Sequence, residues 1–566
     1  MDASPKLSGA EHIKSGSQRL RGRIGEELAA GAAPGGAAPG GVSEETYTLL
    51  KFHGTYEQYD RDTATPRKQA GLDKEWGFMV RVRCPAGRLT AAQWLVLDEL
   101  ADRHGDGTLR LTTRQGVQFH GVARGAVKPL IAAINHALMT TLAACGDVVR
   151  NVVTSPAPRH DAVQARLEAE AIRLSSALLP RSRAHHQIFL DEESAAGSAP
   201  EEEPLYGPTY LPRKFKIGLA HPGDNTPDLL THDLGFLAVV EGGEVTGWIV
   251  TVGGGMGMTH NKPATYPRLA DPIARIGRDE VLEVAEAVVR LARDHGDRAD
   301  RKHARLKYVV AERGVAWVRE RLSADLGRPL EAPGPLPPLA VPELLGWHPQ
   351  GDGRWWLGLP IPAGRIAGGL RQVLREAIRR FGADPVATPQ QDLLLTNIAT
   401  ADRAALEALL REGGVVLAED LTPLARWALA CVALPTCGQA LAEGERVRGQ
   451  VVADLERVLA RHGLAGERLS LRITGCPNGC ARPYGGEIGV VGRAPGLYVL
   501  YLGGDFEGTR LSFPVADKVR LAEVAETLEP ALAAWARQRG AGEGFGDFCL
   551  RLGQAPLQAL LRGVPA

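Results

Sequence analysis

Four cysteines between residues 431 and 480 constrain the fold of this chain more than any other feature. They form a C-x5-C pair, Cys431 and Cys437, and a C-x3-C pair, Cys476 and Cys480, with 38 residues between the pairs. The whole chain has seven cysteines, so most of them fall in this short window. Thiols grouped in this way, in a chain without secretory features, indicate a metal centre rather than disulfide bonds.

The spacing alone leaves three interpretations open. The second pair resembles the close-spaced pairs of structural zinc sites. The first pair is too wide for a tight zinc knuckle, and Pro435 inside it favours a turn. Four thiolates from two loops suit a cubane iron–sulfur cluster, in which each iron takes one soft ligand. The third interpretation is that the cysteines are unrelated core residues, which is how we read Cys84, Cys145 and Cys549.

Length and composition narrow the class of protein. The 566 residues exceed a single core and predict several domains. Lys plus Arg equals Asp plus Glu at 66 each, so no overall field points to nucleic acid or to a membrane surface. No apolar run approaches the length of a membrane span, and the first residues lack the apolar segment of a signal peptide. We therefore expect a cytoplasmic protein, in a reducing compartment that suits thiolate-bound metal.

The first half of the chain contains a stretch of alternating polar residues. Residues 78–84 alternate as a strand, Thr90 is placed to cap a helix over 91–104, and a second strand is predicted over 109–121. In that second strand five polar side chains occupy alternate positions and so share one face: Arg110, Thr112, Arg114, Gln118 and His120. The face is either solvated or a platform for a multiply anionic ligand, because arginine matches carboxylates bidentately.

A second cationic motif is Lys214-Phe-Lys216. On an extended segment its two lysines lie two positions apart and point to one side. Like charges placed side by side repel unless water screens them or an anion lies between them. The motif is therefore either a surface pair or part of an anion site.

Short sequence words recur in the second half. Pro85-Ala-Gly-Arg-Leu returns as Pro362-Ala-Gly-Arg-Ile, and the hairpin that ends at Gly253-Gly has a counterpart that ends at Gly503-Gly504. Thr112-Thr-Arg-Gln has a weaker partner at 388–391, and Arg150 aligns with Arg426. These words keep the same order in both halves, which predicts a pseudo-twofold molecule. We match the Lys214 region of the first half with the Cys476–Cys480 region of the second.

Three longer words resemble the assimilatory sulfite/nitrite reductase family. They are Cys431-Val-Ala-Leu-Pro-Thr-Cys437, Thr474-Gly-Cys476-Pro-Asn-Gly-Cys480-Ala-Arg and Gly542-Glu-Gly-Phe-Gly-Asp-Phe548. The resemblance covers nearly the whole chain from about residue 10. It implies an α+β fold in which ferredoxin-like and sirohaem/iron–sulfur domains are repeated about a pseudo-twofold axis. It also implies two cofactors, a sirohaem and one [4Fe-4S] cluster.

The family pattern also implies roles for individual residues. The cluster ligands would be Cys431, Cys437, Cys476 and Cys480, with Cys480 also the axial ligand of the sirohaem iron. Substrate would be bound by Arg81, Arg150, Lys214 and Lys216. Sirohaem would be bound by Arg110, Thr112, Arg114, Gln118, His120, Lys307, Asn478 and Cys480.

The activity implied by the resemblance is the six-electron reduction of sulfite to hydrogen sulfide in cysteine biosynthesis. The sequence carries no recognisable flavin or NADPH motif, so electrons would come from a separate NADPH-oxidising flavoprotein subunit or from ferredoxin. The Lys-Phe-Lys pattern favours sulfite, because relatives specialised for nitrite typically carry asparagine at the second lysine. Nitrite reduction and a non-catalytic zinc protein are the alternatives.

We expect six segments along the chain. A helical arm and an Ala/Gly/Pro linker over 1–41 precede a first ferredoxin-like half-repeat over 42–150 and a sirohaem and substrate domain over 151–326. A Pro-rich connection over 327–342 leads to a second ferredoxin-like half-repeat over 343–420. The iron–sulfur and sirohaem domain occupies 421–566. Apolar periodicity predicts helices over 279–295 and 442–462.

Overall fold

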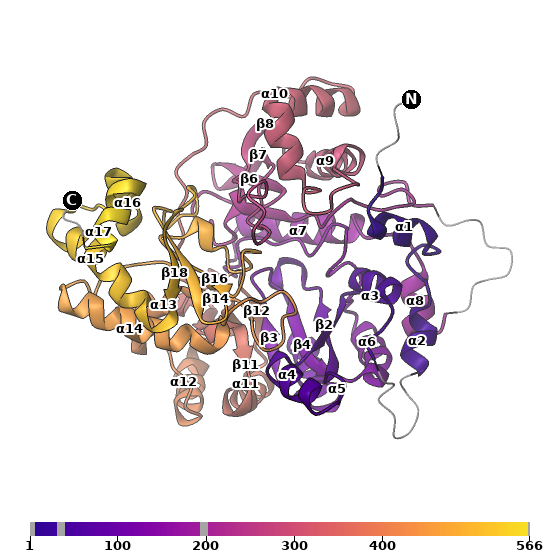
Figure 1. Cartoon of the computed structure of the whole chain (residues 1–566), viewed down its shortest axis with the longest axis horizontal. Coiled ribbons are helices and arrows are strands. Elements are labelled where there is room, and N and C mark those ends of the chain that lie inside the picture. The colour runs from indigo at the N-terminus through magenta and orange to yellow at the C-terminus, as the bar shows by residue number, and fades with distance from the viewer. Residues whose placement is uncertain (1–5, 31–39, 193–201, 564–566) are drawn as a thin grey trace.

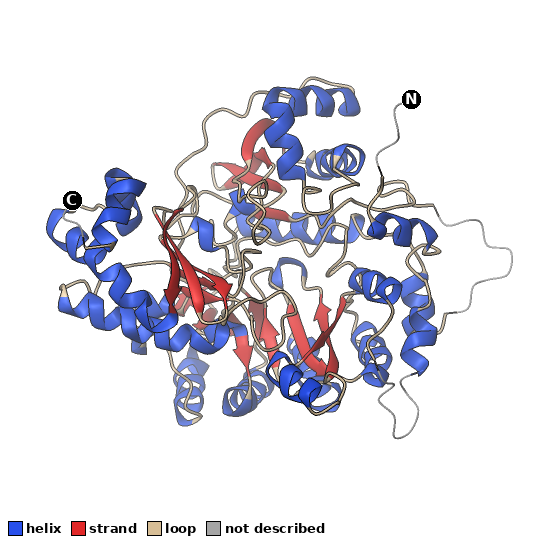
Figure 2. Ribbon diagram, viewed as in Figure 1, coloured by secondary structure: helices blue, strands red, loops and turns tan. Residues whose placement is uncertain are grey.

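Four sheets form the framework of the protein, two in each half of the chain. The structure, a computed structural model, describes residues 6–30, 40–192 and 202–563. Figure 2 shows the strands gathered in the interior with most helices on the outside. Figure 1 shows α9 (Val281–His295) and α10 (Leu306–Leu326) beside β6–β8, and the C-terminal helices beside β14–β18. A fold of mixed helix and sheet is therefore confirmed.

The first sheet has the strand order β1-β2-β4-β3-β11. Its own strands are β1 (Thr55–Tyr59), β2 (Trp76–Val82), β3 (Leu109–Leu111) and β4 (Val117–Val122), and the second half lends β11 (Arg365–Ile366). Two helices cover its apolar face, α5 (Ala91–His104) and α6 (Val127–His136). The side chains buried there include Trp94, Leu97, Val117 and Phe119, and they leave the opposite face for polar residues.

The single strand predicted over 109–121 is wrong, because this segment is a hairpin. β3 and β4 are antiparallel and pair Arg110 with Gln118. Between them the Thr112 hydroxyl accepts hydrogen bonds from the backbone of Arg114 at 3.3 Å and of Gly116 at 3.1 Å. Gln115 has a φ of 54° and completes the turn. A hydrogen bond from a side chain to the backbone competes with the backbone hydrogen bonds of a strand. The alternation of polar and apolar residues in the sequence does not reveal this competition.

The second half repeats this unit as the sheet β12-β13-β10-β9. Its strands are β9 (Gly346–Pro349), β10 (Trp355–Leu359), β12 (Asp384–Ala387) and β13 (Leu393–Ile398), with helices α11 (Gly368–Phe381) and α12 (Arg403–Glu412). The two Pro-Ala-Gly words form the same turn, with a φ of 56° at Ala86 and 54° at Ala363. The predicted repeat is confirmed.

The halves interlock through this turn. Arg365 pairs with Arg110 in the first sheet, and Arg88 bridges reciprocally to Val386 in the second. A Cβ on Gly87 would lie 2.2 Å from the Ala387 carbonyl oxygen, and one on Gly364 would lie 2.2 Å from that of Leu111. Only glycine permits such close backbone approach. On each side of the pseudo-twofold axis, the Pro-Ala-Gly turn of one half therefore packs against the hairpin of the other half.

Two further sheets complete the framework, one in each half of the chain. One is β5-β6-β7-β8, made of β5 (Ile217–Ala220), β6 (Leu234–Glu241), β7 (Glu244–Val252) and β8 (Asp271–Gly277). The other is β14-β15-β16-β17-β18, made of β14 (Ala428–Ala430), β15 (Leu471–Thr474), β16 (Ile488–Ala494), β17 (Leu497–Leu502) and β18 (Phe513–Arg520). Each has a parallel pair followed by a hairpin that ends at a glycine, Gly253 or Gly503, with φ near 90°.

The strand register corrects one part of the predicted repeat. Ile217 pairs with Leu234 and Leu471 pairs with Ile488, so β5 corresponds to β15 residue by residue. Lys214 and Lys216 precede β5 and therefore correspond to Arg468 and Ser470. The Cys476–Cys480 loop follows β15 and corresponds to residues 222–226. The lysines and the cysteines thus come from opposite ends of equivalent strands, which a match of short words does not resolve.

The predicted helices form with small shifts at their ends. α9 covers 281–295 of the segment predicted over 279–295, and its apolar stripe is buried. α14 (Arg448–Arg461) is shorter than the helix predicted over 442–462. The remaining helices near the sheets are α7 (Ala162–Ala177), α15 (Val524–Gln538), α16 (Phe545–Leu552) and α17 (Gln554–Leu561). Nowhere in the described parts of the chain is a helix both long and apolar enough to span a membrane.

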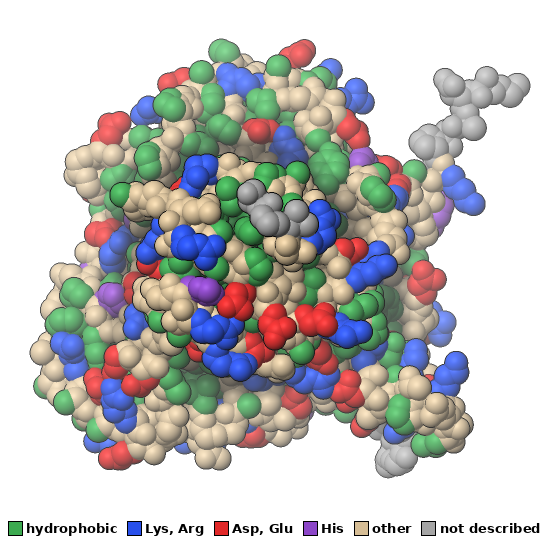
Figure 3. Space-filling view, turned by 60° about the vertical axis from the view of Figure 1, so that its left-hand side comes forward, with side chains coloured by type: hydrophobic (Ala, Val, Ile, Leu, Met, Phe, Trp, Pro, Cys, Tyr) green, Lys and Arg blue, Asp and Glu red, His purple; other side chains and the backbone are tan. Residues whose placement is uncertain are grey.

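The N-terminal arm is helical, as predicted, and packs into the core. Its helices are α1 (Gly9–Gly16) and α2 (Ile24–Ala30), followed by α3 (Glu44–Leu50). Lys14 is buried, lies 2.5 Å from the Glu11 carboxylate and donates to the Leu211 carbonyl oxygen at 2.7 Å. Most of the predicted linker lies outside the described residues. Elsewhere on the surface, Figure 3 shows acidic and basic side chains interspersed, in keeping with the balanced composition.

Candidate functional site

One face of the first sheet presents a row of polar residues. The strand register aligns Arg81 of β2, Gln118 of β4, Arg110 of β3 and Arg365 of β11 side by side. His120 lies two positions further along β4 on the same face. With its amide oxygen turned toward Arg81, Gln118 accepts a hydrogen bond from Nη2 at 2.6 Å. The structure therefore brings together four of the residues predicted at this site.

This face holds more positive charge than its acidic neighbours balance. The Glu445 carboxylate lies 2.7 Å from Arg365 Nε and 3.4 Å from Arg110 Nε. Both ring nitrogens of His120 are buried without a hydrogen-bond partner in the described structure. Burial, and then Arg365 and Arg110, hold the pKa of His120 well below its usual value. An imidazole kept neutral with both nitrogens unpaired is costly unless a ligand satisfies it.

Arg114 lies at the tip of the hairpin and joins it to the next segment of the chain. Its guanidinium donates to the carbonyl oxygens of Asn151 and, at 3.2 Å, Ile217. Its Nε is buried and finds no partner among the described residues. Burial lowers the pKa of Arg114 to about 9, and Arg150 is the next cause. The hydroxyl of Thr112 is used by the turn, so Thr112 shapes the hairpin.

Lys214 and Lys216 flank a buried phenylalanine just before β5. Phe215 forms a parallel bridge with Val149, so the two lysines emerge on the same side of the segment. Neither lysine amine makes a hydrogen bond or ion pair with another described residue. Burial lowers the pKa of Lys214 to about 7, with Arg213 and Arg150 as the next causes. Burial and then Lys214 lower the pKa of Lys216 well below its usual value.

Arg81 and Arg150 meet around Tyr56 of β1. Arg150 Nη2 lies 3.3 Å from the Tyr56 hydroxyl oxygen, and the Arg81 guanidinium carbon lies 6.0 Å from the Tyr56 ring centroid. Arg81 also donates to the Cys145 sulfur at 2.8 Å. Tyr56 is a site residue that the sequence analysis missed. It lies opposite Met79, on the polar face of β2, a register that the sequence does not reveal.

The two cysteine loops are tied together by backbone hydrogen bonds. Cys431 follows β14, and its N–H donates to the Ile473 carbonyl oxygen at 3.1 Å. Leu441 and Ala442 both donate to the Gly475 carbonyl oxygen, at 2.8 Å and 3.0 Å, and Gly475 donates to the Cys431 sulfur at 3.3 Å. All seven cysteines are free thiols. The sequence-distant pairs thus lie in adjoining loops.

The thiols lie close enough to one another to interact electrostatically. Burial, and then the charge interaction with Cys480, raise the pKa of Cys431 above its usual value and that of Cys476 to about 12. Hydrogen bonds from Asn478 to the Cys476 sulfur oppose this rise. Among the described residues no group of three or more His, Cys, Asp or Glu side chains is arranged around a single metal ion. A cubane instead engages each thiolate through a different iron.

Cys480 is the exposed member of the four and faces the first half of the chain. The Thr113 hydroxyl, at the tip of the β3–β4 hairpin, donates to the Cys480 carbonyl oxygen at 3.1 Å. Burial lowers the pKa values of Arg110, Lys214 and Lys216, and Cys480 lies close enough to all three to offset part of that lowering. The cysteine loop therefore lies within electrostatic reach of both cationic groups.

A glycine run closes the site beside the cysteine loop. Met258, next to Gly257, donates to the Pro477 carbonyl oxygen at 2.9 Å. Lys307 was predicted as a direct sirohaem contact, but its amine donates to the carbonyl oxygens of Gly255 at 3.1 Å, Gly257 at 2.7 Å and Tyr266. These three carbonyl oxygens surround the Lys307 amine. In this structure Lys307 shapes the glycine run.

Unpaired donors and clustered thiols together fit the two cofactors that the family pattern implies. Buried guanidinium and imidazole nitrogens without partners suit the carboxylates of a sirohaem. Four thiols in adjoining loops suit the irons of a cluster. The site lies where the halves of the pseudo-twofold molecule meet, so no single half contains it.

Comparison with known proteins adds the family. The family description "Nitrite and sulphite reductase 4Fe-4S domain" matches residues 171–330. The description "Nitrite/Sulfite reductase ferredoxin-like half domain" matches twice, over 73–137 and 348–413. The double match agrees with the two equivalent sheets.

Full-length relatives agree with the domain matches. The chain is 46% identical to a sulfite reductase [NADPH] hemoprotein beta-component of Myxococcus xanthus, over 99% of each protein. It is 43% identical to the protein of that name from Geobacillus kaustophilus, over 96% of each. The solved structure of the Mycobacterium tuberculosis NirA protein superposes with a TM-score of 0.79 and 24% identity, over 98% of each chain. That likeness shows the fold.

Proposed function

Because the chain belongs to the nitrite and sulfite reductase family, we propose that it is the hemoprotein component of an assimilatory sulfite reductase. The reaction would be the six-electron reduction of sulfite to hydrogen sulfide. The observation that carries this proposal is a group of four cations beside the cysteine loops, the buried Arg150 and the half-buried Arg81, Lys214 and Lys216. Cations that are largely withdrawn from water and have few acidic partners favour an anion between them.

The chain's residues divide the binding of the cofactors between them. Carboxylates of the sirohaem would be held by Arg110, Arg114, Gln118 and His120, while Thr112 and Lys307 fix the hairpin and the glycine run. The cluster would be held by Cys431, Cys437, Cys476 and Cys480, with Asn478 donating to the Cys476 sulfur. When bound, the pair of cofactors would supply electrons one at a time, and Cys480 would hold the sirohaem iron as well as the cluster.

The cationic pocket would bind the substrate and deliver protons. Arg81 and Arg150 present planar guanidinium groups that suit the oxygens of a small oxyanion. Lys214 has a pKa of about 7, so it can hold a proton or release it near neutral pH. An anion beside Lys214 and Lys216 favours their charged forms and primes them as donors. Loss of oxygen from sulfite requires protons, and these two amines are placed to give them.

Electrons would come from a partner protein. A separate NADPH-oxidising flavoprotein subunit is the proposed donor, since relatives at 42–46% identity carry the NADPH-dependent name. Ferredoxin is the alternative donor. We also propose a cytoplasmic location, where a reducing environment keeps the seven thiols free.

The test compares two substrates on one enzyme. The purified protein is reduced with an artificial electron donor, and consumption of sulfite and of nitrite is measured under the same conditions. We expect efficient turnover of sulfite. Efficient nitrite turnover with negligible sulfite turnover would instead identify a nitrite reductase with the same centre.

A further inference from the structure

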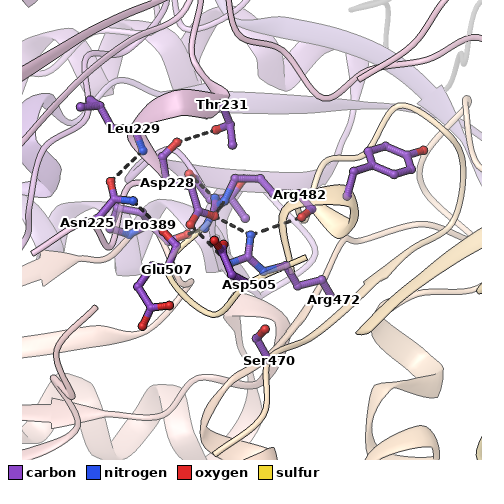
Figure 4. A network of polar contacts seen from close by, with 12 residues as sticks. Asn225, Asp228, Leu229, Thr231, Pro389, Ser470, Arg472, Arg482, Asp505 and Glu507 are labelled. Carbon is purple, nitrogen blue, oxygen red and sulfur yellow. Dashed lines mark hydrogen bonds and ion pairs between the residues drawn. The ribbon is translucent and has the colours of Figure 1, made fainter. Parts of the chain in front are cut away.

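A buried ion triad lies at the junction of the two halves and includes Arg482, two residues after Cys480 (Figure 4). Asp228, in the loop between β5 and β6, has its carboxylate oxygens at 2.6 Å and 3.3 Å from the guanidinium of Arg472 on β15. The same carboxylate accepts a hydrogen bond from Arg482 Nε. All three side chains are buried. None of them belongs to the predicted site.

Hydrogen bonds also fix the backbone of the loop that carries Asp228. Its backbone takes the left-handed conformation, with φ 52°, and its N–H donates to the Asn225 carbonyl oxygen at 2.9 Å. Asn225 accepts from the Leu229 N–H at 2.9 Å and donates across to the Glu507 carbonyl oxygen at 2.8 Å. The Thr231 hydroxyl donates to the Asp228 carbonyl oxygen at 2.8 Å. Figure 4 shows Asn225, Leu229 and Thr231 around Asp228.

Arg482 connects this carboxylate to both hairpins. Its Nη1 lies 3.3 Å from the Thr113 carbonyl oxygen, at the tip of the β3–β4 hairpin. Its Nη2 lies 3.1 Å from the Pro389 carbonyl oxygen, at the tip of the equivalent β12–β13 hairpin. One planar guanidinium therefore contacts three segments that are distant in sequence. Such a fork fixes direction as well as distance, which a lysine amine cannot do.

The contacts of Arg482 bear directly on Cys480, two residues earlier. Thr113 is held from both sides, because its carbonyl oxygen accepts from Arg482 and its hydroxyl donates to the Cys480 carbonyl oxygen at 3.1 Å. Arg482 itself has a φ of 55°, and its N–H donates to the Gly479 carbonyl oxygen at 3.0 Å. Cys480 is thus enclosed in a ring of hydrogen bonds that runs through Arg482 and the hairpin next to Arg114.

We propose that Arg482, held by Asp228 and Arg472, is a positioning residue that sets the Cys480 sulfur relative to the cationic β3–β4 hairpin. This inference rests on the proposed function, in which Cys480 joins the cluster to the sirohaem iron. The cluster loop and the sirohaem platform come from different halves of the chain. The triad is a buried connection that spans both, so it fixes the register between the two cofactors.

Loss of fold stability is the competing explanation, because breaking a buried ion group is destabilising wherever it lies. The chain offers a matched control. Arg371 is also buried and also joins the halves, with Nε 2.6 Å from an Asp98 oxygen and Nη1 2.7 Å from the Gly107 carbonyl oxygen. It links α11 to α5, away from the cysteine loops.

The experiment compares Arg482→Lys with Arg371→Lys in the full chain with its cofactors. Iron, acid-labile sulfide and sirohaem contents are measured, together with thermal unfolding, the sirohaem reduction potential and the magnetic coupling between sirohaem iron and cluster. We expect both variants to lose thermal stability. Only Arg482→Lys should keep its cluster yet shift the potential and weaken the coupling, with turnover reduced about 100-fold, as for a displacement of about 1 Å.

Arg482→Lys with wild-type coupling and potential, and only the stability loss of Arg371→Lys, would overturn the inference. If Arg482→Lys does not fold, Asp228→Asn carries the same test, because it preserves volume and removes the charge that holds Arg482. Wild-type coupling and potential in that variant would equally overturn it. Wild-type protein without sirohaem or cluster would instead refute the proposed function, so the two failures are distinguishable.

Discussion

The proposed cofactor site and its pseudo-twofold counterpart share one architecture and differ in charge. In the site, the aligned row is Arg81, Gln118, Arg110 and Arg365. In the counterpart, the strand register places Gly358, Leu394, Val386 and Arg88 at the same points. The counterpart also contains a cavity of about 440 Å³, which Arg88 and Val386 help to line.

The counterpart neutralises the charges that it keeps. Arg88 donates to the Glu168 carboxylate, and Arg159 Nε lies 3.2 Å from an Asp161 oxygen. In the site, Glu445 is the acid beside Arg110 and Arg365, while His120, Lys214 and Lys216 are left without partners in the described structure. Backbone architecture therefore does not define a binding site in this molecule. Cations and polar groups without partners do, because they favour a ligand of opposite charge or matching hydrogen bonds.

The most severe way to break the comparison is to remove the thiol that the counterpart lacks. Cys480→Ser should abolish turnover and lose the joined cofactor centre, because a serine oxygen is a poor ligand for iron–sulfur clusters. Iron, sulfide and sirohaem contents together with sulfite turnover measure this. Cys549→Ala is the control, since that thiol is buried away from the site. Full turnover in Cys480→Ser would remove Cys480 from the centre.

Lys216 corresponds to the neutral Ser470 in the counterpart. Replacing Lys216 by a neutral residue should slow sulfite reduction without loss of sirohaem. Lys216→Ala should lower sulfite turnover about 100-fold, the range for loss of a general acid, while sirohaem content stays at the wild-type level. Ser470→Ala, at the counterpart position, should leave turnover unchanged. Unchanged turnover in Lys216→Ala would exclude this amine as a proton donor.

Importing an acid should make the site resemble its counterpart. Gln118→Glu places a carboxylate between Arg81 and Arg110, so it should compete with sirohaem carboxylates and weaken sirohaem binding about tenfold. Titration of the apo-protein with sirohaem measures the change. Glu168→Gln, which frees Arg88 in the counterpart, should leave that affinity unaltered. Equal affinities in wild type and Gln118→Glu would show that the row does not bind the carboxylates.

A smaller, pH-dependent difference separates two equivalent carboxylates. Asp233 accepts from the backbone N–H of Lys216 and pairs with Arg305 at 2.7 Å, whereas Glu487 accepts from the equivalent backbone N–H of Ser470. Burial raises the pKa of Glu487 to about 7. The raised value means that the folded state favours the proton. This stabilisation is complete below about pH 4.5 and is lost as the pH rises through 7.

Glu487→Gln should therefore flatten the pH dependence of the unfolding free energy between pH 4.5 and 7. The difference in slope should accumulate to about 3 kcal/mol over that window. Denaturant unfolding at a series of pH values measures it. An unchanged pH profile would mean that Glu487 titrates normally in the folded protein.

Local patterns in the sequence predicted much of the framework. The apolar stripe of 281–295 is periodic, and α9 buries it. The Pro-Ala-Gly words identify turns that both halves form in the same way. The grouped cysteines predicted adjoining loops. In each case the physical cause acts within a few residues of the signal, so the sequence is sufficient.

Other parts of the site depend on contacts between distant segments. Asp228 and Arg482 are 254 residues apart, and nothing local marks either as half of a pair. Lys307 looked like a free cation, but three carbonyl oxygens fold around its amine. The alternating residues of 109–121 predicted one strand, but the turn at Thr112 separates this segment into β3 and β4. The strand register, which the sequence does not reveal, decides which equivalent residues face each other across the halves.

The central claim is that uncompensated cations and clustered thiols hold a sirohaem joined to a [4Fe-4S] cluster. The most direct measurement is the visible spectrum of the purified protein, with and without sulfite, together with its metal content. We predict iron with acid-labile sulfide and chlorin-type bands that shift when sulfite is added. Zinc in place of iron, with no chlorin-type bands, would contradict the account.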